Sequence, residues 1–263
     1  MHTARCSLLL FLSVGLCCAQ PPLAKPRIGY VMDRQGALRP LYGAAGNFIL
    51  GEVLSAENVA FAGSATGALV KTSTEVIWIT ADGEVKNRWP APPGEAQFAF
   101  EPAGSSAFVF FPEKPVLMHM AEGRLETVPL DMERLAGDVV AVAAPGEGSV
   151  ELAVRRGDET WLVTVARAGG EIIDERLLAG VSGPVHLSGG GVLYSGRGEL
   201  VWRTRRGIEK KFPLDAAIEW FATLGAGWVA VSAKAEGAAA LTLYGLRLEE
   251  GREGIYQLPE VAP

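Results

Sequence analysis

The sequence has very few of the side chains that build metal sites and disulfides. It contains three cysteines and three histidines among 263 residues. All three cysteines lie within the first 18 residues (Cys6, Cys17, Cys18), and only His119 and His186 follow residue 2. Because a closed zinc site needs four such ligands, one made of Cys and His alone is excluded after residue 18. We therefore expect no metal, no cofactor and no disulfide there.

Asparagine and net positive charge are also scarce. None of the three asparagines (Asn47, Asn58, Asn87) is followed by the Ser or Thr that N-glycosylation requires. Abundant Ala, Gly and Arg beside little Asn and Lys favour a bacterial origin with a GC-rich genome. The net charge of −6 argues against nucleic acid as a partner. One basic segment, Trp202–Lys211, flanks a turn glycine, and we interpret it as a solvated hairpin tip; contact with an anionic surface is the alternative.

Long hydrophobic runs are missing too, apart from Leu8–Leu16, which is too short to span a bilayer. This run follows Arg5 and precedes small residues at a cleavage position before Gln20, the arrangement of a secretory signal peptide. We predict a signal peptide at 1–19 and a single domain at 20–263. The mature protein is expected in the periplasm or outside the cell.

Two alternatives to a cleaved signal remain open. The segment could stay uncleaved as an anchor, or Cys17 or Cys18 could be acylated as in a lipoprotein. Lipoprotein signals prefer Gly, Ala or Ser before the modified cysteine, whereas Leu16 and Cys17 stand there. We therefore favour cleavage without acylation.

What the sequence does contain is a repeat of glycine turns between apolar strands, with a period of 37 to 47 residues. The turn glycines are Gly36, Gly83, Gly123, Gly170, Gly207 and Gly251. Five residues before each glycine stands an apolar residue: Val31, Trp78, Met118, Val165, Trp202 and Leu246. This period is typical of propeller blades, and Asp82-Gly83 favours a type I′ hairpin. Trp78 and Trp202 share one repeat position, which predicts packing between blades.

A second set of strand pairs lies between these hairpins. They are Val59–Ala62 with Ala68–Lys71, Phe98–Glu101 with Ala107–Phe111, Val139–Ala143 with Val150–Val154, Val185–Leu187 with Val192–Ser195, and Ile218–Ala222 with Trp228–Ser232. Two hairpins per unit give four strands, the content of a propeller blade. We predict an all-β propeller of four-stranded antiparallel blades, most simply six with one incomplete. Five or seven blades are alternatives. Residues 44–58 could add a strand or cross an end of the ring.

At this point the chain resembles a known group. Phe98-Ala-Phe-Glu-Pro-Ala-Gly-Ser-Ser-Ala-Phe-Val is similar to the strand-turn-strand of WD40-like, TolB-like and YVTN-type propellers of secreted bacterial proteins. Gly29-Tyr-Val-Met-Asp-Arg-Gln-Gly resembles the opening repeat of such proteins. The resemblance implies the fold. Such repeats carry no catalytic residues, so it implies no activity.

The sequence shows no motif of nucleophilic catalysis. Gly-x-Ser-x-Gly is absent. Met118-His119-Met120 invites a copper site, but in a strand the two methionines point to one face and His119 to the other. Propellers usually bind ligands around the central channel, and the innermost strands contribute few polar residues. These weak channel candidates are Gln97, Glu101, His186 and Glu219.

Three functions follow from this sequence. The first is an exported, non-catalytic propeller that binds a protein or a cell-envelope component. The alternatives are a glycoside or ester hydrolase with carboxylates in the channel, and a structural protein without a specific ligand. A pocket holding two carboxylates would favour the hydrolase.

Overall fold

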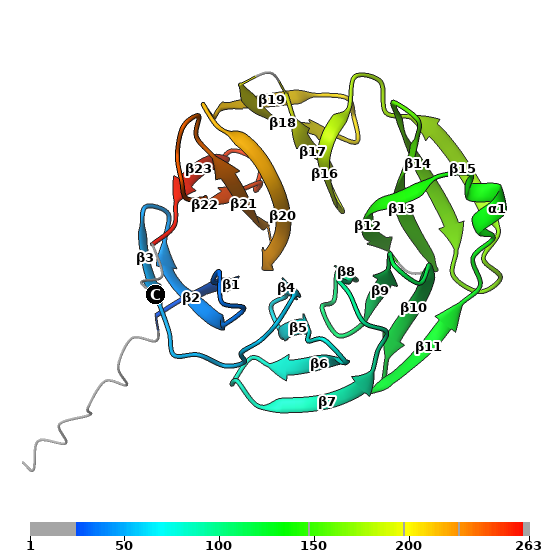
Figure 1. Cartoon of the computed structure of the whole chain (residues 1–263), viewed down its shortest axis with the longest axis horizontal. Coiled ribbons are helices and arrows are strands. Elements are labelled where there is room, and N and C mark those ends of the chain that lie inside the picture. Colours follow the sequence, from blue (N-terminus) through cyan, green and yellow to red (C-terminus); the bar gives the residue numbers. More distant parts are fainter. Residues whose placement is uncertain (1–24, 147, 197, 226, 260–263) are drawn as a thin grey trace, which may run out of the picture.

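The computed structural model describes residues 25–146, 148–196, 198–225 and 227–259, and in it six sheets are arranged in a ring (Figure 1). The predicted signal peptide lies outside the described residues. The first sheet has three strands: β1 (Arg27–Met32), β2 (Leu38–Ala44) and β3 (Asn47–Leu50). The other five have four each, so the prediction of a six-bladed propeller with one incomplete blade is confirmed.

In each blade, consecutive strands are neighbours, and their order in the sequence is their order from the channel to the outer rim. The second and third blades contain β4 (Ala60–Gly63), β5 (Gly67–Lys71), β6 (Glu75–Thr80) and β7 (Val85–Pro90), then β8 (Gln97–Phe100), β9 (Ala107–Phe111), β10 (Val116–Ala121) and β11 (Arg124–Val128). The fourth contains β12 (Asp138–Gly146), β13 (Ser149–Arg156), β14 (Glu159–Ala166) and β15 (Ile172–Leu177). The fifth and sixth contain β16 (Ser182–Ser188), β17 (Gly191–Ser195), β18 (Glu199–Thr204) and β19 (Glu209–Pro213), then β20 (Ala217–Gly225), β21 (Trp228–Lys234), β22 (Thr242–Arg247) and β23 (Gly254–Gln257).

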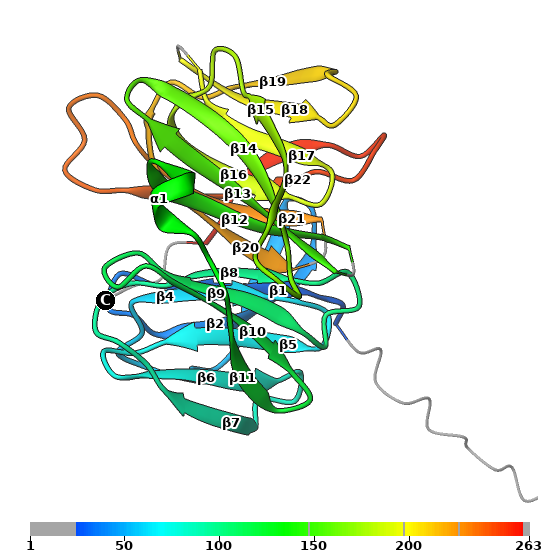
Figure 2. The ribbon, with the colours of Figure 1, turned by 90° about the vertical axis from the view of Figure 1, so that its right-hand side faces the viewer.

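One short helix interrupts the strands. Helix α1 (Met132–Leu135) lies at the outer rim, between the third and fourth blades (Figure 1, Figure 2). Asp131 caps it by accepting a hydrogen bond from the backbone N–H of Arg134 at 3.0 Å. Within the described residues, no helix is long and apolar enough to cross a membrane.

The turn after β6 differs from its prediction in type. The N–H of Gly83 donates to the carbonyl of Thr80, and the N–H of Thr80 donates to the carbonyl of Glu84. Gly83 has a positive φ of 86°, but Asp82 is not among the residues with positive φ. A type I′ turn needs positive φ at both central residues, so the type I′ prediction is wrong. The hairpin instead uses a type I turn followed by a glycine bulge.

The first strand of the first blade differs in direction from the first strands of the other five blades. Residues Asp33–Gln35, at the end of β1, line the central cavity beside the starts of the five innermost strands. At the beginning of β1, Arg27 donates to the carbonyl of Ala65, in the turn after β4, at 2.9 Å. Strand β1 is therefore antiparallel to β4, β8, β12, β16 and β20, like the second strand of a blade.

The first blade consequently lacks an innermost strand. Strands β20 and β4 contact each other directly. They close an inner ring of five strands on the channel side of β1 (Figure 1). Gly36 has the same place in the sequence repeat as Gly83, which turns the outer strands β6 and β7 of the second blade. In the structure Gly36 instead turns β1 into β2, at the end where the inner strands begin. The outer hairpin of this blade is β2–β3, which turns near Gly46 (φ 83°). The predicted extra strand within 44–58 is β3.

The hydrophobic core is divided among the interfaces between blades. Four clusters each fill one interface, and Trp78 and Trp202 are buried in two of them, as predicted. A fifth cluster joins residues of the sixth, first and second blades, including Leu224, Tyr30 and Phe61. We call this junction the seam. Two interfaces share one cluster there because no inner strand of the first blade separates them.

Candidate functional site

A cavity of about 1310 Å³ occupies the end of the channel at which the five inner strands begin. We call this end the entry end. Each inner strand is hydrogen-bonded on one side only, so its other backbone edge faces the channel. Side chains of Met32, Phe61, Phe98, Trp220 and Phe221 add apolar surface to the wall. Concave cavities lined by apolar and aromatic side chains with a few polar groups are the usual ligand sites of proteins.

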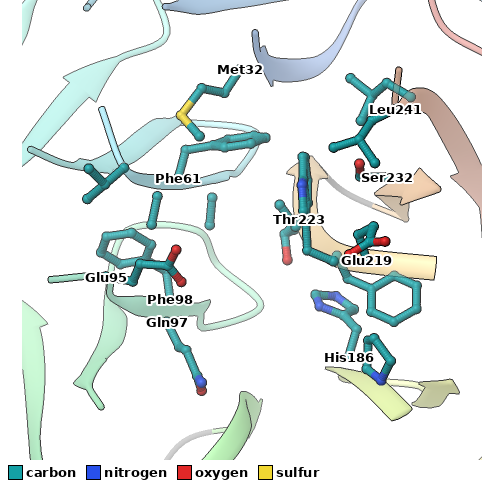
Figure 3. Close-up of a pocket in the computed structure, with 18 of the residues that line it drawn as sticks. Met32, Phe61, Glu95, Gln97, Phe98, His186, Glu219, Thr223, Ser232 and Leu241 are labelled. Atoms are coloured by element: carbon teal, nitrogen blue, oxygen red, sulfur yellow. The ribbon is translucent and has the colours of Figure 1, made fainter. Parts of the chain in front are cut away.

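Three of the four predicted channel residues line this cavity: Gln97, His186 and Glu219 (Figure 3). Glu101 does not. It is buried just after β8, where its carboxylate accepts a hydrogen bond from Ser106 and lies 3.5 Å from Arg167 Nη1 of the fourth blade. Glu101 thus links two blades away from the cavity.

His186 is the most perturbed ionisable group of the wall. Burial lowers its pKa to about 4, so the imidazole is neutral at neutral pH. Its ring lies 6.2 Å from the ring of Phe221, centroid to centroid, and its Nε2 atom has no hydrogen-bond partner in the described residues. An unpaired buried nitrogen costs free energy unless water or a ligand satisfies it.

Gln97 presents a second unpaired atom. Its Nε2 donates to the carbonyl of Val139 at the start of β12, at 3.3 Å, which fixes the orientation of the amide. Its Oε1 atom is buried and has no partner in the part of the chain that is described. Gln97 therefore offers an acceptor, and His186 a neutral donor or acceptor, to a molecule in the channel.

Bulges position the polar groups of the entry end. In β20, Ile218 pairs with Ala233 and Trp220 pairs with Ser232, so Glu219 is an extra residue without a partner across the ladder. Register shifts also occur near the starts of β12 and β16, whereas the pairings of β4 and β8 show none. Bulges re-aim side chains next to binding sites. Here the bulge leaves Glu219 exposed at the cavity wall.

Sequence reasoning missed Glu95, Arg34 and Arg155. Glu95 precedes β8, while Arg34 follows β1; all three line the cavity. Arg34 donates to the carbonyl of Leu241, and Arg155 donates to the carbonyl of Gly183 at 2.6 Å. A search for polar residues just outside the inner strands would have found Glu95.

Within the described residues, no nucleophile of the cavity wall is hydrogen-bonded to a base. Neither Thr223 nor Ser232 shares a hydrogen bond with His186 or Glu219, as a hydroxyl activated for nucleophilic catalysis would. No three His, Cys, Asp or Glu side chains of this part of the chain gather as metal ligands do. Met118 and Met120 pack in one core cluster, whereas His119 packs on Phe108, 4.9 Å between ring centroids, as the strand geometry predicts.

The predicted basic hairpin tip is largely neutralised by neighbouring carboxylates. Arg205 makes two hydrogen bonds, of 2.7 and 2.6 Å, to Glu151 of the fourth blade. The other pairs are Arg203 with Glu209, Lys210 with Glu253 and Lys211 with Glu199. This tip therefore connects blades.

Comparison with known proteins supports the fold alone. No family model and no curated protein matches the sequence. The nidogen propeller, solved in complex with laminin, is similar with a TM-score of 0.59 at 10% identity, covering 88% of this chain and 92% of that one. PorZ of Porphyromonas gingivalis, a surface component of the type-IX secretion system, gives 0.51 at 13% identity. That match covers 89% of this chain, which spans only 31% of PorZ.

A third similar structure is the β-propeller domain of Cps50 (Swd1) from Myceliophteria thermophila. Its TM-score is 0.50 at 14% identity, with 90% of this chain and 88% of that one covered. Sequence identities this low do not indicate that these proteins share an activity with this chain. The six sheets make the chain a six-bladed β-propeller, and the comparisons support the β-propeller fold.

Proposed function

We propose that this chain is an exported, non-catalytic binding protein, and that a protein or cell-envelope component docks at the entry end of its channel. The observation that carries the proposal is the 1310 Å³ cavity, whose wall combines aromatic side chains with polar atoms that lack partners. Such a wall can bind a ligand by apolar contact and a few directed hydrogen bonds. Export is supported by the signal-like pattern of residues 1–19.

Fold-level analogy is consistent with the proposal. The similar propellers include a bacterial surface component and a protein solved bound to its partner. Propellers present a rigid ring end to a macromolecule, and function resides in the side chains grafted on it.

Capture with a blocked cavity tests the proposal. Ala60 lies half-buried on the wall, at the margin of the core cluster between the second and third blades, so Ala60→Trp adds a large ring at the entry end. The unfolding temperature of this variant is compared with that of wild type before capture, so that only a folded variant is used. The matched control is Ala168→Trp, which adds the same ring to an exposed turn of the fourth blade. Cell-envelope and secreted fractions are passed over immobilised wild type and both variants, and bound proteins are compared. We expect a partner retained by wild type and Ala168→Trp and lost with Ala60→Trp. Equal retention by all three, or none by any, would overturn the proposal.

Export has a separate test. The chain is produced with its first 24 residues in a bacterium, and the N-terminus of the recovered protein is sequenced. We expect it to begin at Gln20 in the periplasmic fraction. Recovery of the uncleaved chain in the cytoplasm would refute export and leave the binding proposal intact.

A further inference from the structure

The missing innermost strand leaves a free backbone edge on β1. The N–H of Asp33, the residue after β1, donates to the carbonyl of Ala37, and the carbonyl of Asp33 accepts from the N–H of Gly36, so both backbone groups of Asp33 point toward the β2 side. Hydrogen-bonded and non-hydrogen-bonded pairs of residues alternate along an antiparallel ladder. Met32, paired with Leu38, is therefore a non-hydrogen-bonded position whose N–H and C=O point away from β2.

The partner residue confirms this alternation. Leu38 donates its N–H to Ser55 and accepts at its carbonyl from Leu54, both on the far side from β1. No strand pairs with β1 on its inner side within the described residues. The backbone N–H and C=O of Met32 thus have no ladder partner, an uncommon state for a half-buried strand.

The cavity extends beside this edge. It reaches Ser232 on β21 and Thr242 and Leu243 on β22, the second and third strands of the sixth blade. At the other blades the wall is formed by innermost strands and their flanks, apart from Arg155 on β13. The extension lies at the seam, where an inner strand of the first blade would otherwise stand. We call it the seam pocket.

The far end of this space is closed. A Cβ atom on Gly29 would lie 2.0 Å from the carbonyl oxygen of Leu224, so β20 passes directly across β1 there. An added strand can pair with Met32 at the entry end but cannot continue to Gly29. The space therefore suits a short extended segment, not a full fourth strand.

We infer that the seam pocket binds a short extended protein segment, which pairs its backbone with Met32 and inserts an apolar side chain between the sixth and first blades. A free strand edge selects an occupant that offers N–H and C=O groups at strand spacing. The apolar contacts come from Met32, Leu243 and Leu258. Charge contributes little to the choice of segment, because the wall carries acidic and basic side chains together: Asp33, Glu95 and Glu219 with Arg34 and Arg155. Asp33 also lies 3.9 Å from Arg39.

This inference rests on the proposed function and specifies how the partner is held. The innermost strands of the chain itself indicate a suitable probe, because their side chains already fit inner positions of this ring. We choose the peptide acetyl-Lys-Val-Ala-Phe-Ala-Lys-amide, which copies residues 59–62 between two lysines for solubility. Its control has the same sequence with every central amide N-methylated, which removes the donors needed for strand pairing.

Amide exchange of Met32 gives the decisive measurement. Binding of the first peptide to the intact protein is followed by calorimetry, and exchange of individual amides is followed by NMR. We expect the Met32 amide to exchange at least about ten-fold more slowly with the first peptide, and the methylated peptide to bind at least about five-fold more weakly. Equal binding of both peptides, unchanged exchange at Met32, or no binding at millimolar peptide would overturn the inference.

A pair of variants checks the position of the side chain. Leu243→Glu places a carboxylate in the seam pocket, and Val85→Glu makes the same change at an exposed position of the second blade. Only the first should abolish peptide binding. A cavity-dependent partner found by capture, together with failure of the peptide, would overturn the strand pairing and leave the proposed function standing. Because the exchange experiment uses unaltered protein, it decides the inference even if a variant does not fold.

Discussion

Replacing Gly63 by alanine should destabilise the ring at the seam. A Cβ atom at this position would lie 2.0 Å from the carbonyl oxygen of Leu224 and 2.9 Å from a ring carbon of Tyr30. Real Cβ atoms are essentially never closer than 3.0 Å to such atoms, so β4 and β20 must separate by about 1 Å. Gly63 is not among the residues with positive φ, so the expected cost is steric and does not come from the backbone angle.

The magnitude follows from the atoms that must move. Overpacking a rigid core typically costs about 1–3 kcal/mol, and here the obstructing atom is backbone, which cannot rotate away. We therefore expect the free energy of unfolding to fall by about 3 kcal/mol. For a domain of this size that corresponds to a decrease in Tm of roughly 6–12 °C.

Urea unfolding followed by tryptophan fluorescence measures this change. The control is Gly189→Ala, because a Cβ at Gly189 meets nothing within 4 Å and Gly189 is not among the positive-φ glycines. This control should be neutral or stabilised by a few tenths of a kcal/mol, as the unfolded chain loses freedom. If Gly63→Ala unfolds at the same urea concentration as the control, the close approach of β4 and β20 is refuted.

Three further changes test other contacts. Arg205→Ala should lower the free energy of unfolding by about 1–2 kcal/mol, because it leaves the buried carboxylate of Glu151 without its partner while water still reaches part of the site. Acid should lower the free energy of unfolding of the wild type through His186, whose pKa of about 4 in the folded state lies below the ordinary 6.5. The unfolded state therefore takes up the proton first, and stability is lost as the pH falls from 6.5 to 4. Glu101→Gln should lower the pKa of His119, measured by NMR titration, because the carboxylate 3.6 Å away opposes the effect of burial.

Each of these has its own control. Lys211→Ala removes a more exposed ion pair with Glu199 and should shift the urea midpoint clearly less than Arg205→Ala does. Equal shifts of the two variants would contradict the buried-pair argument. For His186, the stability advantage of wild type over His186→Asn should shrink between pH 6.5 and 4 and stay constant above. A constant difference across that range would contradict the burial of the imidazole. An unchanged His119 pKa would show that Glu101 does not act on it.

The strands of five blades could be predicted because their signals are local. Alternating apolar residues and glycine turns define hairpins within about 15 residues, as in Val150–Val154 and its partner strand. Glycine alone does not reveal which hairpin it closes. Gly36 fits the repeat in sequence, yet it lies at the opposite end of the ring from the turn of Gly83, because the first blade has lost its innermost strand.

The candidate site was predictable only in part. His186 and Gln97 could be placed on the channel wall because they lie in the inner strands of their hairpins. Glu101 ends its strand and is drawn to Arg167, a partner 66 residues away that no local pattern reveals. Likewise, Lys71 looks like an ordinary strand end but is fully buried, and burial lowers its pKa. Contacts between blades decide these cases, and such contacts are not encoded in any short segment.

The seam also has a consequence for the order of folding. Each blade is closed by hairpins between consecutive strands, which can form early because their loops are short. Gly63 and Leu224 are far apart in the chain, so bringing them together costs loop-closure entropy. Packing contacts offset this cost only when the intervening blades are in place. We expect the ring to close last. Changes at the seam should then accelerate unfolding while leaving the folding rate nearly unchanged.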